Sequence, residues 1–300
     1  MEPSGILIIN KPEGITSHDV VNKVRRLFST RRVGHTGTLD PMASGVLVIL
    51  IGRAAKAAEY ISSSKKAYVA TLRLGTTYDT QDITGTPLKV CEEIPSTDAV
   101  ISAVNTFSGD IMQIPPMYSA LKVNGQKLYD LARKGIEVER EARPITIHSI
   151  SATPTSDPKD YILSVECSSG TYIRTLCEDI GTSLGCGAAM ATLKRTLAGN
   201  FDIEHSYTIE EVEALTEEKR YALLHPTEDL FFELEQIKLP TFYEKLSRNG
   251  CEIYLKKIGY DLPLGQRVRL CSQAGDFYAL GEVKDYENGK AIKAIKLFDI

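Results

Sequence analysis

Residues 31–51, RRVGHTGTLDPMASGVLVILI, join a polar, glycine-rich loop to the longest apolar run in the chain. The run from Val46 to Ile51 has the length of a strand and no polar interruption, which is typical of a strand buried on both faces. The residues before it include two arginines, three glycines and a single carboxylate, Asp40. Glycine lets a backbone approach a ligand closely, so this loop indicates a site that presents one acid. Asp40-Pro41 is also typical of a simple turn, and composition alone leaves both interpretations open.

The whole chain has the composition of an ordinary globular protein. It has 300 residues, of which 43% are hydrophobic and 25% are charged. That is enough to bury one large core or a large and a small one, and it excludes collagenous, mucin-like and wholly disordered classes. No apolar run approaches the ~20 residues of a membrane-spanning helix, and the N-terminus lacks the basic and apolar segments of a secretory signal. We therefore expect a cytoplasmic protein that does not enter a membrane.

The net charge of −4 conceals an uneven distribution along the chain. Residues 204–235 contain ten acidic side chains against Lys219 and Arg220, a local balance of −8. The rest of the chain therefore carries +4, since −4 − (−8) = +4. Because the acidic charge is confined to one segment, the overall charge does not exclude a nucleic-acid partner.

The cysteines and histidines do not form a recognisable metal motif. No two cysteines have the C-x-x-C spacing of a zinc or redox site, and the five histidines are scattered. In a cytoplasmic chain such cysteines are typical of small buried apolar residues. The six are Cys91, Cys167, Cys177, Cys186, Cys251 and Cys271.

The predicted elements favour an α+β fold. Periodicity predicts strands at 5–10, 46–51, 68–74, 145–150 and 161–167, and helices at 17–27, 53–61, 97–107, 127–134 and 171–184. Strands and helices do not alternate regularly, so a doubly wound parallel sheet is disfavoured. We expect a mixed, mostly antiparallel sheet flanked by helices.

The C-terminal part of the chain predicts a separate small β domain. Three strands are expected at 267–271, 277–283 and 291–298, joined by turn-rich residues. Ahead of them, Thr208-x-x-Glu211 is a capping box that opens an acidic helix. We therefore predict two domains, residues 1–235 and 236–300.

Three further candidates each allow a functional and a structural interpretation. Arg174, at the start of a helix, could hold a carboxylate from elsewhere in the chain, or pair with Glu178 one turn later. Tyr68 heads a strand beside two lysines and could stack on a nucleic-acid base or simply pack in the core. Asp79 and Asp82 weakly suggest a metal loop, although capping of a turn is the more typical role.

Five ordered segments together resemble the bacterial tRNA pseudouridine-55 synthases of the TruB family. The resemblance covers about residues 5–235, and the small β domain after residue 236 resembles a PUA-type RNA-binding module by position and strand pattern. The segments are Asn10-Lys11-Pro12-x-Gly14-x-Thr16-Ser17, Gly34-His35-Thr36-Gly37-Thr38-Leu39-Asp40-Pro41-x-Ala43-x-Gly45-Val46-Leu47, Lys66-Ala67-Tyr68, the stretch from Gln113 to Lys122, and the stretch from Cys167 to Leu176.

The resemblance implies isomerisation of uridine 55 in the T-loop of tRNA to pseudouridine. The base is detached from C1′, turned and rejoined through C5, with no metal or nucleotide cofactor. It implies that Asp40 is the essential carboxylate, acting as nucleophile or in proton removal, that Arg174 pairs with it, and that Tyr68 stacks on the target base. It further implies that four other residues line the pocket or contact the RNA around it: His35, Tyr172, Leu193 and Lys11.

The resemblance also bears on partners and on competing functions. The sequence from Lys122 to Gly135 resembles that of the stand-alone bacterial enzymes. We therefore expect a monomer that acts on the T-arm of tRNA without a guide RNA or an obligate protein partner. A zinc nucleobase deaminase would need H-x-E and P-C-x-x-C, and neither occurs. An N-glycosylase would usually carry a second carboxylate to position water. An RNA-binding protein without catalysis is disfavoured by the intact set of Asp40, Tyr68 and Arg174.

Overall fold

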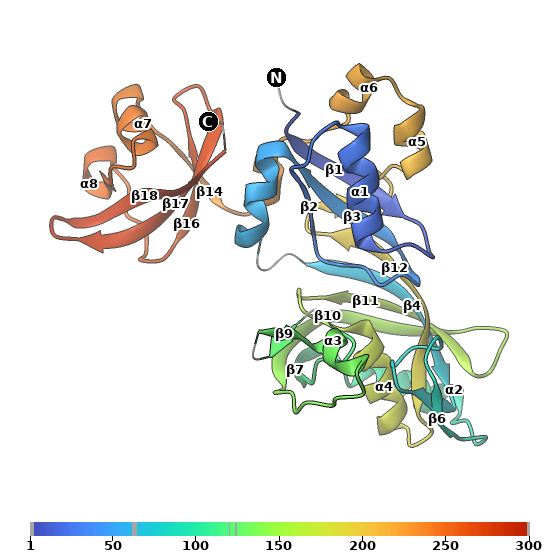
Figure 1. The fold of residues 1–300 in the computed structure, drawn as a ribbon. Helices are drawn as coiled ribbons and strands as arrows, with labels where there is room; N and C mark the ends of the chain where they lie inside the picture. The colour runs from blue at the N-terminus through green and yellow to red at the C-terminus, as the bar shows by residue number, and fades with distance from the viewer. Residues whose placement is uncertain (1–2, 62–64, 120, 124, 299–300) are drawn as a thin grey trace.

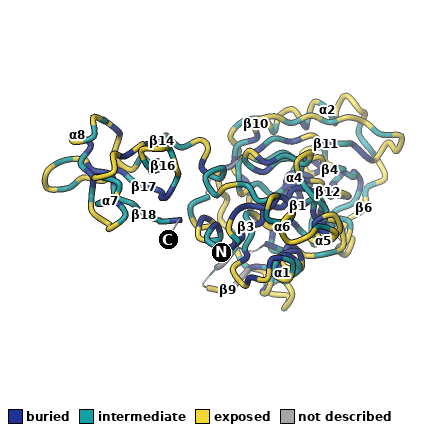
Figure 2. The backbone as a smooth tube through the Cα atoms, turned by 90° about the horizontal axis from the view of Figure 1, so that it is seen from above, coloured by how far each residue is buried: buried dark blue, intermediate teal, exposed yellow. Residues whose placement is uncertain are grey.

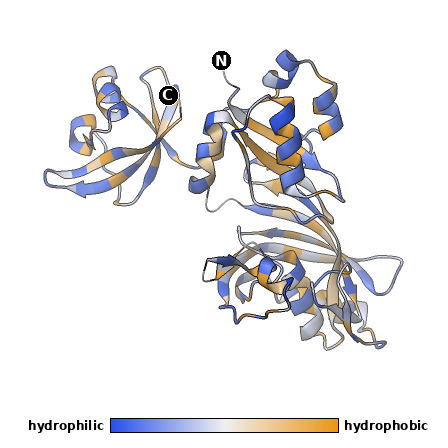
Figure 3. Cartoon of the chain, in the orientation of Figure 1, coloured by the Kyte–Doolittle hydropathy of each residue, from blue (hydrophilic) through white to orange (hydrophobic). Residues whose placement is uncertain are grey.

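Two apolar strands form one end of the largest sheet of the protein. The computed structural model describes residues 3–61, 65–119, 121–123 and 125–298. Strands β1 (Gly5–Lys11) and β3 (Ala43–Ile51) pair antiparallel along their whole length. Alternate side chains enter two different cores: Leu7 and Leu47 lie in one, and Ile6 and Val46 lie in the other. Both faces are therefore buried, which confirms the prediction for the apolar run and explains its lack of polar residues (Figure 3).

The large sheet has nine strands and is mostly antiparallel. Within the described residues, the pair β12–β3 is its single parallel contact. The predicted α+β architecture is confirmed. The order is β1, β3, β12 (Ala188–Ala198), β4 (Lys66–Leu74), β11 (Asp160–Cys167), β10 (Arg143–Pro154) and β7 (Gly109–Gln113), with β2 (Val33–Thr36) on β3 and β13 (Phe201–Asp202) on β12.

Three helices cover one face of this sheet and share its main core (Figure 1). Helix α1 (Ser17–Leu27) begins at a capping box between Thr16 and Asp19 and buries Val20 and Val24, as its apolar spacing predicts. The other two are α2 (Thr97–Asn105), capped by Ser96, and α4 (Ile173–Ser183). Figure 2 shows the buried sheet strands inside a rim of exposed loops and helices.

The C-terminal body has its own five-stranded sheet and its own core. Three of its strands confirm the prediction, whereas two short strands and two helices were not predicted. The sheet runs β14 (Glu235–Lys238), β16 (Arg267–Cys271), β17 (Phe277–Tyr286), β18 (Gly289–Leu297) and β15 (Ile253–Tyr254), with α7 (Thr241–Arg248) and α8 (Leu255–Ile258) beside it. A small apolar cluster that includes Ala57, Phe231 and Leu280 joins this body to the larger one.

Two local predictions differ from the structure. The loop at 31–45 contains strand β2, because its backbone pairs with β3 despite the polar His35 and Thr36. The acidic segment is not one helix: the capping box of Thr208 opens α5 (Ile209–Ala214), but Leu215 is extended and ends it. The segment continues as α6 (Glu217–Ala222) and the 3-10 turn η2 (Thr227–Phe231).

The remaining short elements connect the sheets. They are η1 (Gly52–Tyr60), β5 (Thr76–Tyr78), β6 (Pro87–Val90), β8 (Lys122–Val123), β9 (Gln126–Lys127) and α3 (Leu128–Ala132). In the described ranges, no helix is both long and apolar enough to cross a membrane. All six cysteines are free; the expectation of burial is correct for four of them but wrong for Cys251, which is exposed, and for Cys91, which is half-buried.

Candidate active site

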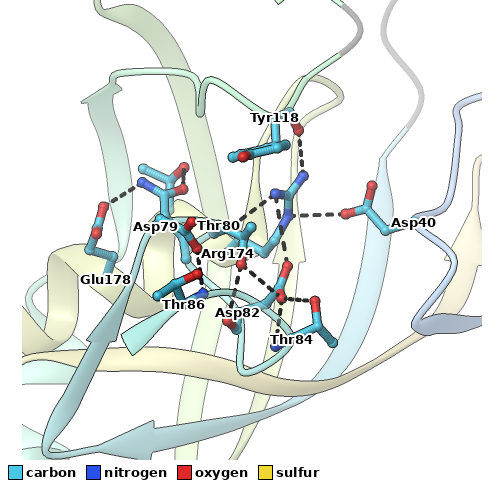
Figure 4. Close-up of polar contacts among 11 residues, drawn as sticks. Asp40, Asp79, Thr80, Asp82, Thr84, Thr86, Tyr118, Arg174 and Glu178 are labelled. Atoms are coloured by element: carbon cyan, nitrogen blue, oxygen red, sulfur yellow. Dashed lines mark hydrogen bonds and ion pairs between the residues drawn. The ribbon is translucent and has the colours of Figure 1, made fainter. Parts of the chain in front are cut away.

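An ion pair between Asp40 and Arg174 lies at the centre of the site (Figure 4). Asp40 lies in the turn between β2 and β3, and Arg174 lies in the first turn of α4. Arg174 Nε is 3.0 Å from Asp40 Oδ2, and the two side chains are 7% and 38% exposed. A carboxylate that remains partly open is thus held by a guanidinium that is almost fully buried. Of the two interpretations of Arg174, the structure contains the pair with a distant carboxylate; Glu178 instead accepts a hydrogen bond from Gln81.

The other edges of the guanidinium are also fixed. Arg174 Nη1 donates to the carbonyl of Thr80 at 3.1 Å, and Nη2 donates to the carbonyl of Tyr118 at 2.8 Å. Asp82 adds a second negative charge at 4.0 Å from Nη1. With acceptors on several sides, the guanidinium has one orientation, and so does the carboxylate that it holds.

The loop that carries Asp82 is a capped turn. Asp82 accepts hydrogen bonds from the hydroxyl of Thr80 and from the backbone amide of Thr84, each at 3.0 Å. Asp79 accepts a bond from the amide of Thr86 at 2.7 Å. The turn-capping interpretation is therefore correct for both aspartates. No group of three or more His, Cys, Asp or Glu side chains that could share a metal ion occurs in the part of the chain that the structure describes.

The backbone around Asp40 is anchored by the segment that follows β1. The hydroxyl of Ser17 donates to the carbonyl of Leu39 and accepts from its amide, at 3.0 and 2.9 Å. The amide of Gly14 donates to the carbonyl of Pro41 at 2.8 Å. These contacts fix the turn on the start of α1, so two polar stretches that are separate in the sequence form one structural unit.

Lys11 belongs to this anchor, which differs from the expected contact with RNA. Its side chain is 0% exposed, and its ammonium donates to the carbonyls of Pro12 and Ile15, both at 2.8 Å, and of Pro41 at 3.4 Å. Burial lowers the pKa of Lys11 to about 8, although the charge of Asp40 opposes the shift. With its donors used by carbonyls, Lys11 supports the Asp40 turn from beneath.

Tyr68 lies on β4 and is 7% exposed. Burial raises the pKa of Tyr68, while the positive charge of Arg195 opposes that rise. The phenol is therefore neutral at physiological pH, and its ring packs in the main core next to the site. Its expected stacking on a base stays a prediction.

The other expected pocket residues surround the same region. Tyr172 is the N-cap of α4, and its backbone amide and carbonyl both bond to the side chain of Gln113, at 2.8 and 3.0 Å. Leu193 on β12 pairs in register with Ala43, close to the end of the Asp40 turn. His35 lies on β2. Burial, followed by the charges of Arg195 and His18, lowers the pKa of His35, so its imidazole is neutral near pH 7.

Arg195 is the functional candidate that the sequence did not reveal. It lies on β12, its residue is 1% exposed, and its Nε donates to the carbonyl of Val46 at 2.7 Å. Its Nη2 donates to the carbonyl of Gly37 at 3.0 Å. A charged residue on a strand is typically exposed, so no local signal distinguishes Arg195 from its neighbour Lys194. Only the pairing of β12 with β3 places it under the glycine-rich loop.

Comparisons with known proteins show which family the chain resembles. Residues 25–173 match the family described as "TruB family pseudouridylate synthase (N terminal domain)", and residues 174–231 match "tRNA pseudouridylate synthase B C-terminal domain". The chain is 44% identical over 299 residues to tRNA pseudouridine synthase B of Clostridium kluyveri, covering 98% of this chain and 99% of that protein. It is 43% identical to the protein of the same name from Alkaliphilus oremlandii, with 98% of each covered.

A solved structure resembles the whole fold. The crystal structure of a Cbf5-Nop10-Gar1 complex contains a chain with a TM-score of 0.76 and 25% sequence identity, covering 98% of this chain and 84% of that one. The two family matches meet between residues 173 and 174, inside the larger body, so that boundary is not the one between the two sheets.

The fold and the paired carboxylate therefore define a pseudouridylate synthase, an isomerase. Within that class, the chain belongs to the TruB family.

Proposed function

We propose that the protein isomerises uridine 55 in the T-loop of tRNA to pseudouridine, with Asp40 as the catalytic carboxylate. The observation that carries the proposal is the ion pair between Asp40 and Arg174 in a turn anchored from three directions. The proposal is supported by the relatives named tRNA pseudouridine synthase B, which align over almost the full chain.

The reaction is an internal exchange of one bond for another. The bond between C1′ and N1 of the uridine breaks, the base turns, and C1′ bonds to C5. The proton of C5 leaves and N1 gains one, so that atoms and charges balance without a co-reactant. Asp40 faces the reacting nucleotide with its open side, and Arg174 keeps its orientation fixed during the exchange. The neutral hydroxyl of Tyr68 is suited to move a proton beside the base.

The target base must leave the stacked T-loop before it can turn. Extrusion of a nucleotide costs a few kcal/mol, which contacts with the protein must offset. We assign this role to the ring of Tyr68, to Tyr172 and Leu193 at the pocket wall, and to the neutral imidazole of His35. The Nδ1 atom of His35 is buried and has no hydrogen-bond partner among the described residues.

The C-terminal body is proposed to bind the rest of the tRNA. Residues 236–300 carry eleven Lys or Arg against eight Asp or Glu, a balance of +3. We propose the division into a catalytic domain, residues 1–235, and a PUA-like RNA-binding domain, residues 236–300. On this proposal the protein works as a monomer in the cytoplasm, without cofactor, guide RNA or protein partner.

The test uses an unmodified tRNA transcript incubated with the purified protein, followed by carbodiimide treatment and primer extension. We expect one new stop, at position 55, and none with a transcript that carries cytidine there. Release of free uracil would instead identify a glycosylase. Absence of both products would refute the proposed function.

A further inference from the structure

Two cations flank the glycine-rich loop without a carboxylate beside either of them. Lys66, at the start of β4, is partly buried, and Arg195, on the adjacent β12, is almost completely buried. Over the described ranges, neither side chain has a carboxylate within 4.0 Å, in contrast to Arg174 with Asp40. The donors Nε and Nη2 of Arg195 are bound to carbonyls. The ammonium of Lys66 has no hydrogen bond to any residue that the structure describes.

Both cations converge on a single point of the loop, at Gly37. A Cβ built on Gly37 would lie 3.2 Å from Lys66 Nζ and 3.5 Å from Arg195 Nη1, and the φ of Gly37 is +73°. Glycine is needed there for its backbone conformation and because a side chain would fill the space in front of the two cations. Gly37 is three residues before Asp40 in the same loop. The charges of Arg195 and of Asp40 both act on Tyr68, so these groups belong to one region of the site.

Burial of uncompensated positive charge is unfavourable, and it is typical of sites that receive an anion. Lys66 shows this cost directly: burial, together with the charge of Arg195, lowers its pKa to about 8. The nearby Lys11 does not relieve the imbalance, because it is a third cation. An anion from outside the chain would compensate these charges.

We propose that Lys66 binds a backbone phosphate of the substrate RNA directly beside the target uridine, with Arg195 strengthening the site from beneath. The inference rests on the proposed function, since an RNA nucleotide that brings its C1′ to Asp40 carries its phosphate to the edge of the same pocket. A phosphate fits better than a base, because an ammonium is a compact charge with three donors and bases carry no negative charge. Arg195, which donates to the carbonyl of Gly37, is a positioning residue.

The first test compares RNA binding by four proteins that all carry Asp40→Asn, so that no turnover occurs. They are the parent, Lys66→Met, Lys66→Arg and the matched control Lys65→Met; Lys65 is the neighbouring lysine, exposed and paired with Glu166. For a T-arm stem-loop RNA we expect Lys66→Met to bind about tenfold or more weakly, the loss typical of a charged hydrogen bond. Its plot of log K against log salt should be shallower by roughly 0.7–0.9. Lys66→Arg and Lys65→Met should stay within about twofold of the parent.

The second test locates the phosphate. Each linkage that flanks the target uridine is replaced by a neutral 2′-deoxy methylphosphonate and compared with a 2′-deoxy phosphodiester at the same place. At one of the two flanking linkages, the neutral replacement should weaken RNA binding by the parent. The same replacement should not weaken binding by Lys66→Met, because that variant already lacks the contact. The proposal is overturned if Lys66→Met binds as well as Lys65→Met, or if its sensitivity at each linkage equals that of the parent.

Two controls separate this result from other failures. Equal thermal unfolding of Lys66→Met and Lys66→Arg shows that a loss of binding comes from charge and not from misfolding. Binding is measured without turnover, so it is independent of whether the wild-type protein produces pseudouridine. A protein that fails in the carbodiimide assay but retains the Lys66-dependent linkage effect would refute the proposed function and keep the phosphate site.

Discussion

Replacement of Arg174 by lysine tests whether the fixed geometry of the guanidinium, and not only its charge, serves the reaction. Arginine reaches Asp40 Oδ2, the carbonyl of Thr80 and the carbonyl of Tyr118 together, through three different nitrogens. Lysine offers one nitrogen, which can hold the carboxylate or the carbonyls but not all three. Two charge-assisted hydrogen bonds, at roughly 1.5 kcal/mol each, would be absent, a destabilisation of about 3 kcal/mol.

The expected effects on stability and activity are separable. At roughly 2–4 °C for each kcal/mol in a body of this size, Tm should fall by about 6–12 °C. Turnover should fall by about 100-fold or more, because a carboxylate that is no longer oriented loses transition-state stabilisation of roughly 3 kcal/mol. Affinity for tRNA should change by less than about threefold, because Arg174 is too deeply buried to contact the RNA backbone.

The assays are single-turnover pseudouridine formation at saturating tRNA, filter binding and thermal unfolding. The matched control is Arg73→Lys, which disrupts another arginine–aspartate pair, between Arg73 on β4 and Asp160 on β11, outside the site. Arg73 is 41% exposed, so its replacement should cost at most about 1 kcal/mol and leave turnover unchanged. If Arg174→Lys kept turnover within threefold of the wild type while Tm fell as expected, the geometric role of the pair would be refuted.

Four further outcomes follow from the site and its surroundings. Asp40→Asn should fold and bind tRNA nearly normally yet form no pseudouridine; measurable multiple turnover by a preparation free of wild-type protein would contradict this. Tyr68→Phe should bind RNA almost normally and Tyr68→Leu should lose about 1–3 kcal/mol, whereas equal binding by the leucine variant would exclude stacking. Neutralising the exposed Lys256 and Lys257 of α8 should make the plot of log K against log salt shallower by roughly 0.7–0.9 for each phosphate that the variant no longer binds. Turnover at saturating RNA should not change. An unchanged slope would show that α8 does not contact the RNA. On the proposal, Lys66 binds phosphate in its charged form, and its pKa in the free protein is about 8. The affinity of the wild type for RNA should therefore fall as pH rises from 7 to 9, and more steeply than that of Lys66→Arg. Parallel pH curves for the two proteins would contradict the phosphate contact. The two groups that act on Lys66, Cys167 and Arg195, do not change charge between pH 7 and 9. Burial raises the pKa of Cys167 to about 11, and Arg195 stays protonated.

Local structure could be predicted from the sequence because its causes are local. The capping box at Thr208 involves a partner only three residues away, and it occurs as predicted. The uninterrupted apolar run of β3 likewise encodes its own burial on two faces, since only such a strand tolerates apolar side chains in both directions. The resemblance to the TruB family added the expectation that Asp40 meets Arg174, which no local pattern contained.

Tertiary structure alone decided which polar residues became buried and what they touch. Lys11 was expected to contact RNA, but the chain between β2 and β3 brings the carbonyl of Pro41 to its ammonium. Arg195 had no distinguishing neighbour in sequence, yet the parallel contact between β12 and β3 places it beneath Gly37. Strand order depends on the summed burial of many distant side chains, and that sum is not visible in any short window of sequence. The grouping of Lys66 and Arg195 at Gly37 is therefore a property of the assembled sheet, because only its strand order brings these residues together.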